Sequence, residues 1–159
     1  MSVLAAGTPA PDFKLVAADG EDFTAADLQG KTTVLVFYPF AFSLVCTDQF
    51  QLYEDILPEL AERGGVLYGV SCDSPYAQGA FKEKLGVSSE QLSDFEPKGA
   101  ASDAFGVRHP GGFSQRALVI TGPDGVIRWS YEGENPGVLP PPELLRDGIA
   151  AAFAADAPA

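Results

Sequence analysis

The chain has 159 residues, 46% of them apolar, and 22 acidic against 10 basic side chains give it a formal net charge of −12. No apolar run approaches the roughly 20 residues that span a bilayer, and phosphate binding requires clustered basic residues that this composition does not supply. We therefore expect neither nucleic acid nor a membrane as a partner. The length and apolar content predict one domain, residues 1–159, with a substantial core.

The N-terminus and the cysteine count bear on the compartment. The first seven residues lack the basic start of a secretory signal and are too short for its apolar stretch. Two cysteines in such a chain do not predict a structural disulfide, so we expect a cytoplasmic protein. One histidine and two cysteines form no cluster with metal-ligand spacing. We expect neither a metal nor another cofactor.

The order of apolar runs and turn residues predicts an α/β chain. Alternating residues around Asp19-Gly20 indicate an N-terminal hairpin, and the unbroken apolar run over 33–38 indicates a buried strand. Ser74 and Pro75 are typical of a helix start and Gly86 of a helix end. The expected elements are a hairpin over 12–23, a helical turn over 25–28, a strand over 33–38, a helix over 50–61, a strand over 66–72, a helix over 76–85, a loop over 87–98, a short helix over 101–105, a hairpin of strands 116–121 and 126–131, and a helix over 142–153.

This order of elements is that of a thioredoxin-like domain. A central mixed sheet with helices on both faces accommodates the order strand, helix, strand, helix, β-hairpin and terminal helix. We therefore predict a thioredoxin-like α/β fold that begins with a β-hairpin.

The junction that follows the strand over 33–38 carries the chemistry. Cys46 lies between this strand and the next predicted helix, where the first backbone N–H groups of a helix have no intrahelical partner. These groups and the helix dipole stabilise an anion such as a thiolate, which is the reactive form of cysteine. Ser43 brings a hydroxyl to the same turn and Pro39 fixes the backbone that enters it. We interpret Cys46 as a reactive thiolate.

Pro39, Ser43 and Cys46 match the pattern P-x-x-x-[T/S]-x-x-C, and the chain resembles the peroxiredoxins. The resemblance extends from residues 7–13 to the last helix and includes Arg116 at the start of a strand. The segments 92–95 and 104–107 and the short tail resemble the small one-cysteine alkyl hydroperoxide reductase E type. The resemblance implies a thiol-dependent peroxidase that reduces hydrogen peroxide and organic hydroperoxides.

The resemblance also implies a role for each residue of the site. Cys46 is the peroxidatic cysteine that becomes a sulfenic acid. Ser43 hydrogen-bonds the peroxide or thiolate, Arg116 holds both, and Pro39 shields the sulfur. The backbone N–H groups of Val45 and Cys46 are further donors.

One further residue has an expected role, and two alternatives stay open. Gln49 stands where the family often has Glu or Gln, and we expect it to orient Arg116. Ser43 is alternatively only a helix cap. Arg116 is alternatively a surface charge, with Arg108 or Arg128 in its place.

Two interpretations of Cys72 remain. It ends the predicted strand over 66–72, at the sheet edge where α/β folds form ligand crevices, so it is either a resolving thiol or a small core residue. We favour the core residue and hence a one-cysteine mechanism. In that case an external thiol, such as a thioredoxin-like protein or a low-molecular-weight thiol, must reduce Cys46.

The resemblance further implies a homodimer, with Phe40 and Phe42 as candidates for its interface. Two other functions compete with the peroxidase. A thioredoxin-like disulfide carrier is disfavoured, since Cys46 has no partner at C-x-x-C spacing. A peroxide-sensing redox switch begins with the same chemistry, and only turnover with a reductant separates it from an enzyme.

Overall fold

The computed structural model describes residues 2–156, whose seven strands form one sheet in the order β2-β1-β5-β4-β3-β6-β7. The strands are β1 (Lys14–Ala17), β2 (Asp22–Thr24), β3 (Thr33–Phe37), β4 (Val66–Ser71), β5 (Glu90–Ser93), β6 (Ala117–Thr121) and β7 (Ile127–Glu132). The helices are the 3-10 turn η1 (Ala25–Leu28), α1 (Leu44–Tyr53), α2 (Leu57–Glu62), α3 (Pro75–Leu85), α4 (Ala100–Ala104) and α5 (Pro142–Asp156). None of these helices is long and apolar enough to cross a membrane.

The centre of the sheet mixes parallel and antiparallel pairing. β3 runs parallel to β4 and antiparallel to β6, while β1 with β2 and β6 with β7 form antiparallel pairs. Every residue of β3 is buried, as expected for a strand covered on both faces. The predicted thioredoxin-like α/β fold and its N-terminal hairpin are confirmed.

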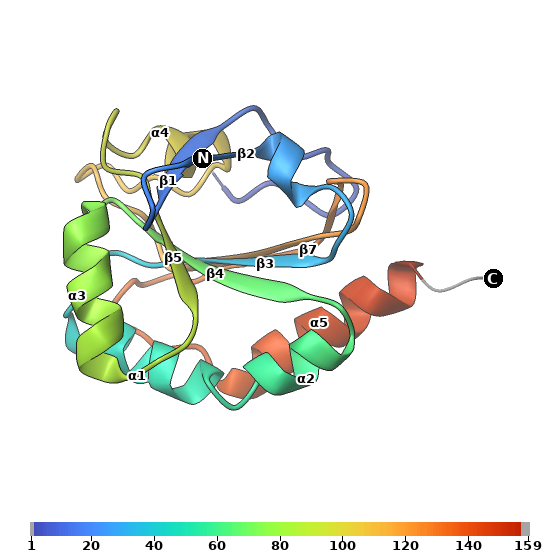
Figure 1. Ribbon diagram of the computed structural model, residues 1–159. Coiled ribbons are helices and arrows are strands. Elements are labelled where there is room, and N and C mark those ends of the chain that lie inside the picture. The colour runs from blue at the N-terminus through green and yellow to red at the C-terminus, as the bar shows by residue number, and fades with distance from the viewer. Residues whose placement is uncertain (1, 157–159) are drawn as a thin grey trace.

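Each face of the sheet carries its own core. In Figure 1, α1, α2 and α5 lie below the sheet, whereas α4 lies above it. Because successive side chains of a strand point to opposite faces, Val34 and Val36 join the core with Cys46. Leu35 and Phe37 join the other core, which includes Ala101 of α4. Cys46 therefore belongs to the lower face.

The helix predicted over 50–61 is wrong in both its start and its continuity. α1 begins at Leu44, so Cys46 lies in the first helical turn, and the chain is interrupted between Tyr53 and Leu57. Pro58 explains the interruption. A proline has no N–H for the i→i−4 hydrogen bond, and its ring collides with the carbonyl four residues earlier, here Glu54.

The loop predicted over 87–98 is also wrong, because it contains β5. This strand pairs in parallel with β4 and antiparallel with β1. Its polar residues conceal it in the sequence, yet Gln91 and Ser93 are buried and hydrogen-bonded. Gln91 accepts from the Tyr38 hydroxyl at 2.7 Å, and the Ser93 hydroxyl donates to the Asp73 carbonyl at 2.6 Å. Only the tertiary partners make this segment a strand.

Candidate active site

The segment between β3 and α1 is fixed at both of its ends. After β3, the Tyr38 N–H donates to the Val70 carbonyl at 3.0 Å. The Ala41 N–H donates to the Asp73 carboxylate at 2.8 Å, which attaches the segment to the end of β4. Phe42 adopts φ 71°, which is costly for a residue other than glycine. Its ring packs against Phe81 with centroids 5.4 Å apart, and this contact helps to hold the backbone.

The three motif residues occupy distinct positions around the start of α1. Pro39 is buried in the segment that follows β3. Ser43 is the N-cap residue of α1, but its side chain makes no capping hydrogen bond, so its hydroxyl is not engaged as a helix cap. Val45 and Cys46 lie in the first turn of α1, where backbone N–H groups lack intrahelical partners. Cys46 is fully buried.

Arg116 reaches Cys46 from the residue before β6. Its Nη2 donates to the Cys46 sulfur at 3.1 Å, and its Nη1 donates to Gln49 Oε1 at 2.6 Å. Its Nε donates to the Pro136 carbonyl at 3.0 Å, in the loop between β7 and α5. All three nitrogens of the guanidinium are thus engaged. Its planar fork is therefore held in a single orientation against the sulfur.

The guanidinium of Arg116 has no carboxylate partner within the described residues. Only 1% of Arg116 is exposed, and the four ion pairs found among residues 2–156 involve other cations. A buried charge is costly unless an opposite charge and hydrogen bonds compensate it. The Cys46 sulfur is the group in contact with Arg116 that can carry negative charge. The buried cation therefore lies directly beside the sulfur of the cysteine.

A second hydrogen bond continues from Gln49 along α1. Gln49 Nε2 donates to the Tyr53 hydroxyl oxygen at 3.2 Å, and both side chains are buried. Burial raises the pKa of Tyr53, so this hydroxyl stays neutral at physiological pH. Cys46, Gln49 and Tyr53 are three and four residues apart, which places them on one face of the helix.

Cys72 lies apart from this network. It stands two residues after Val70, which packs in the core shared with α4. The intervening Ser71 points to the other side, where its hydroxyl oxygen accepts from Gln78 Nε2 of α3. Burial, followed by the charge of Asp94, raises the pKa of the Cys72 thiol to about 11. The Asp94 carboxylate accepts from two backbone N–H groups at the start of α4. The surroundings of Cys72 therefore belong to the α4 side of the sheet.

The structure brings some predicted residues together and separates others. It joins Cys46, Gln49 and Arg116, whereas Arg128 pairs with Asp124 and Asp156 instead. The sequence analysis missed Tyr53 and the Pro136 carbonyl. The spacing of four residues between Gln49 and Tyr53 could have indicated their contact on one helix face. No sequence pattern indicates a contact between Arg116 and a backbone carbonyl 20 residues away.

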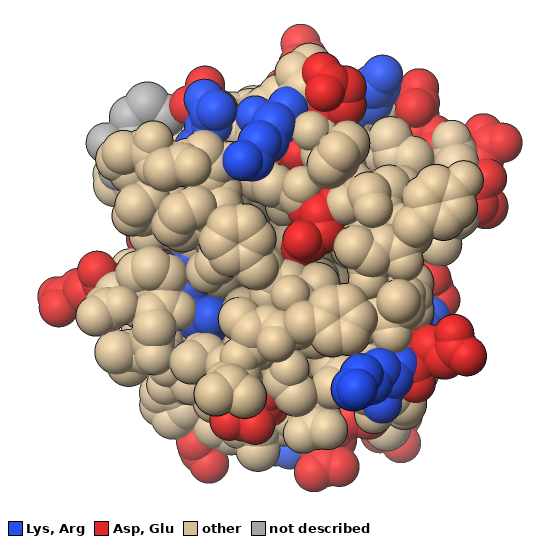
Figure 2. Space-filling model, turned by 90° about the vertical axis from the view of Figure 1, so that its left-hand side faces the viewer, with Lys and Arg blue, Asp and Glu red and all other residues tan. Residues whose placement is uncertain are grey.

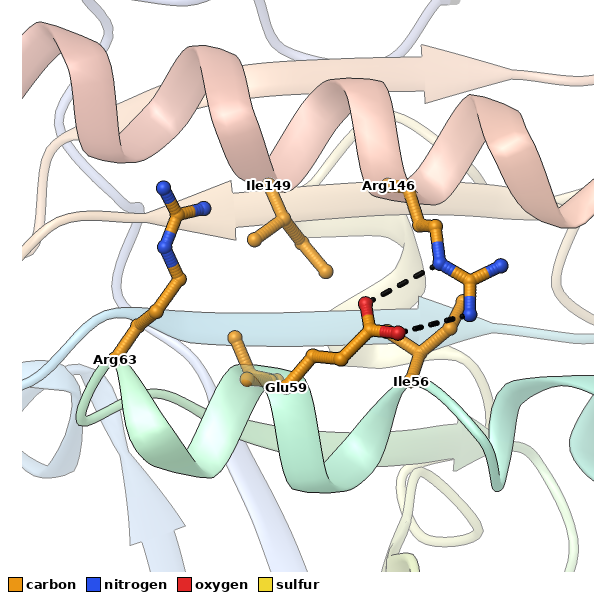
Figure 3. Close-up of a pocket in the computed structure, with 6 residues that line it drawn as sticks. Ile56, Glu59, Arg63, Arg146 and Ile149 are labelled. Carbon is orange, nitrogen blue, oxygen red and sulfur yellow. Dashed lines mark hydrogen bonds and ion pairs between the residues drawn. The ribbon is translucent and has the colours of Figure 1, made fainter.

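A separate hollow, whose lining does not include Cys46, lies between α2 and α5 (Figure 3). Its volume is about 80 Å³, and Arg146 of α5 donates two hydrogen bonds to the Glu59 carboxylate of α2 at its rim. Arg63 lies over the ring of Phe153, 4.7 Å from its centroid. The hollow is lined by Ile56, Glu59, Leu60, Arg63, Arg146 and Ile149. It contains no nucleophile, so we do not assign the chemistry to it.

A thioredoxin-like fold with a buried cysteine in a first helical turn, held by a buried arginine, defines a thiol-dependent oxidoreductase. The AhpC/TSA family profile matches residues 6–130. Alkyl hydroperoxide reductase E of Mycobacterium tuberculosis is 31% identical over 151 residues, which cover 94% of this chain and 98% of that protein. The chain belongs to the AhpC/TSA family: it is a peroxiredoxin, a thiol-dependent peroxidase.

Two further similarities agree with this assignment and confirm the resemblance seen in the sequence. Peroxiredoxin Bcp of Escherichia coli is 32% identical over 131 residues, which cover 82% of this chain and 80% of that protein. The crystal structure of Enterococcus faecalis AhpC matches with a TM-score of 0.84 at 28% identity, over 96% of this chain and 95% of that one.

The raised pKa of Cys72 predicts a pH-dependent reactivity. With a pKa of about 11 in the folded state, the reactive thiolate of Cys72 is scarce at pH 7 and grows as the pH approaches 11. In a Cys46→Ser variant, alkylation of Cys72 by iodoacetamide at pH 7 should be roughly 100-fold slower in the native than in the urea-unfolded protein. Equal rates in the two states would contradict the buried environment described for this thiol.

Proposed function

We propose that this protein reduces hydrogen peroxide and organic hydroperoxides at Cys46 by a one-cysteine mechanism. The observation that carries the proposal is the 3.1 Å contact between the buried Arg116 guanidinium and the Cys46 sulfur. A cation in this position stabilises the attacking thiolate before the reaction. It then stabilises the negative charge that passes to oxygen during the reaction.

The first half of the proposed cycle is a nucleophilic displacement on oxygen. The Cys46 thiolate attacks the terminal peroxide oxygen, an S–O bond forms, and the O–O bond breaks. Sulfur loses two electrons and becomes a sulfenic acid, while the departing alkoxide or hydroxide takes a proton and leaves as alcohol or water. Arg116 and the N–H groups of Val45 and Cys46 stabilise the charge, the Ser43 hydroxyl orients the peroxide, and Pro39 excludes water.

The second half of the cycle requires an external thiol. Its thiolate attacks the sulfenic sulfur and displaces water, which leaves a mixed disulfide that a second thiol reduces back to the Cys46 thiol. A thioredoxin-like protein or a low-molecular-weight thiol fits this role. A cytoplasmic location, where such thiols are kept reduced, suits the cycle.

The surroundings of Cys72 support a one-cysteine mechanism. Cys46 packs in the core that contains α1, whereas the neighbours of Cys72 lie on the α4 side of the sheet. A disulfide requires the two side chains to point toward each other, so resolution by a thiol on the other face of the sheet would demand that the chain around it rearrange. Resolution by Cys72 and a redox switch without turnover are the two alternatives.

Aromatic side chains around the segment 39–46 favour organic as well as inorganic peroxides. Phe40 packs against Phe113 with ring centroids 5.0 Å apart, and the Phe113 ring stacks on His109 at 4.2 Å. Phe40 remains 43% exposed. Partly exposed aromatic side chains of this kind can bury the alkyl portion of a hydroperoxide from water.

Exposed apolar side chains on the same side of the molecule support a homodimer. Leu44 is 85% exposed, Tyr76 90% and Phe42 49%, and Phe42 is linked to α3 through Phe81. Figure 2 shows the side of the molecule on which α3 lies: residues without charge cover most of this face, with single acidic and basic groups among them and more charged groups at its margin. Contiguous apolar surface rimmed by charge is typical of protein interfaces.

The dimer proposal predicts a specific effect of charge at Leu44. Leu44→Glu should place a carboxylate in the interface and shift the protein from dimer to monomer, because a buried unpaired charge is costly. Sedimentation velocity at micromolar concentration measures the two species. Leu52→Glu, on an exposed position of the same helix, is the matched control and should leave the dimer intact. A monomeric wild-type protein would overturn the proposal.

The catalytic proposal predicts the mass of the oxidised protein. After one equivalent of hydrogen peroxide, with a sulfenic-acid trap present, wild type and Cys72→Ser should both carry the adduct on Cys46. Loss of two hydrogens in wild type, with the adduct only in Cys72→Ser, would instead make Cys72 the resolving thiol. Turnover with an added thiol separates the enzyme from a redox switch. An unmodified Cys46 in both proteins would overturn the peroxidase assignment.

A further inference from the structure

The geometry points to Tyr53 as a positioning residue of the peroxidase, acting through Gln49 on the guanidinium of Arg116. This inference rests on the proposed function. Tyr53 does not touch the sulfur. It closes a chain of hydrogen bonds that runs from Cys46 to Arg116 at 3.1 Å, from Arg116 to Gln49 at 2.6 Å, and from Gln49 to the Tyr53 hydroxyl at 3.2 Å.

The amide of Gln49 must present its oxygen to Arg116. A guanidinium carries only donors, so an amide turned by 180° would place its NH₂ group against the donors of Arg116. That arrangement would push the guanidinium away from the sulfur. The observed orientation puts Gln49 Oε1 on Arg116 and directs the Gln49 NH₂ group away from it, toward Tyr53.

Tyr53 supplies the acceptor that this NH₂ group needs. Gln49 is fully buried and only 1% of Tyr53 is exposed, so bulk water does not reach the pair. A buried donor without a partner carries the full cost of its desolvation. Without the hydroxyl of Tyr53, Gln49 would turn or shift toward another acceptor and loosen its hydrogen bond to Arg116.

The rest of the structure holds Tyr53 in place. It ends α1 one helical turn after Gln49, and it packs in the same core as Cys46 and Phe50. Its raised pKa keeps the hydroxyl neutral, so it does not compete with the thiolate for the charge of Arg116. Tyr53 therefore orients Gln49 without adding a second anion to the site.

The test compares Tyr53→Phe with a matched control in stopped-flow measurements with hydrogen peroxide. Tyr53→Phe should lower the second-order rate constant of Cys46 oxidation by about 3- to 10-fold, because it removes one buried hydrogen bond from the chain. Tyr38→Phe removes another buried hydroxyl from the same core, one bonded to Gln91 at 2.7 Å. Its rate should stay within about twofold of wild type, even where urea unfolding shows a similar loss of stability in both variants.

A rescue experiment separates positioning from a general loss of structure. Either oxygen of a glutamate at position 49 can accept from Arg116, so no inverted orientation exists there, and Tyr53→Phe should cost less rate in the Gln49→Glu background than in wild type, although the Tyr53 hydroxyl can also donate to the carboxylate. A rate for Tyr53→Phe equal to wild type would overturn the inference. The same fold-loss in the Gln49→Glu background would also overturn it. A wild-type protein that does not react with peroxide would refute the proposed function instead.

Discussion

The buried charge of Arg116 is the constraint on which the rest of the site depends. A guanidinium taken out of water must find an anion and acceptors for its donors, and here it finds the Cys46 sulfur, Gln49 and the Pro136 carbonyl. These partners come from two parts of the chain, α1 and the loop before α5, and Arg116 itself comes from a third, the residue before β6. Folding therefore assembles the cation and the nucleophile together, and the cost of burying one is offset by the charge of the other.

The sheet determines what the second cysteine can do. β3 and β4 are parallel neighbours, so both strands end on the same side of the sheet. Cys46 and Cys72 come after these two strand ends. The two thiols nevertheless lie on different faces: Cys46, in the first turn of α1, packs in the core below the sheet, whereas Cys72 lies among the residues around α4 above it. The two cysteines follow neighbouring strands, but they lie on different faces of the sheet and are not placed to react with each other. For this reason we favour an external reductant.

The sequence was informative where local chemistry decides the structure. Ser74 caps α3 by accepting from the Ala77 N–H at 3.2 Å, and Gly86 ends it with φ 67°, as predicted. The strand that leads to Cys46 was evident from its apolar run. Local patterns failed where distant partners decide. β5 depends on β4 and β1. The break before α2, by contrast, has a local cause in Pro58 that the apolar periodicity conceals. The carbonyl of Pro136 at Arg116 has no signature in the sequence.

The most direct test of the account is the rate of Cys46 oxidation by hydrogen peroxide in Arg116→Met, measured by stopped flow on a variant shown to be folded. Loss of the fixed cation should lower the second-order rate constant by about 10²- to 10³-fold. Arg116→Lys should recover only part of it, because an ammonium cannot hold the three partners of the fork at once. Arg146→Met removes an arginine far from the site and should react like wild type. A folded Arg116→Met protein that reacts within about threefold of wild type would contradict the central role given to this contact.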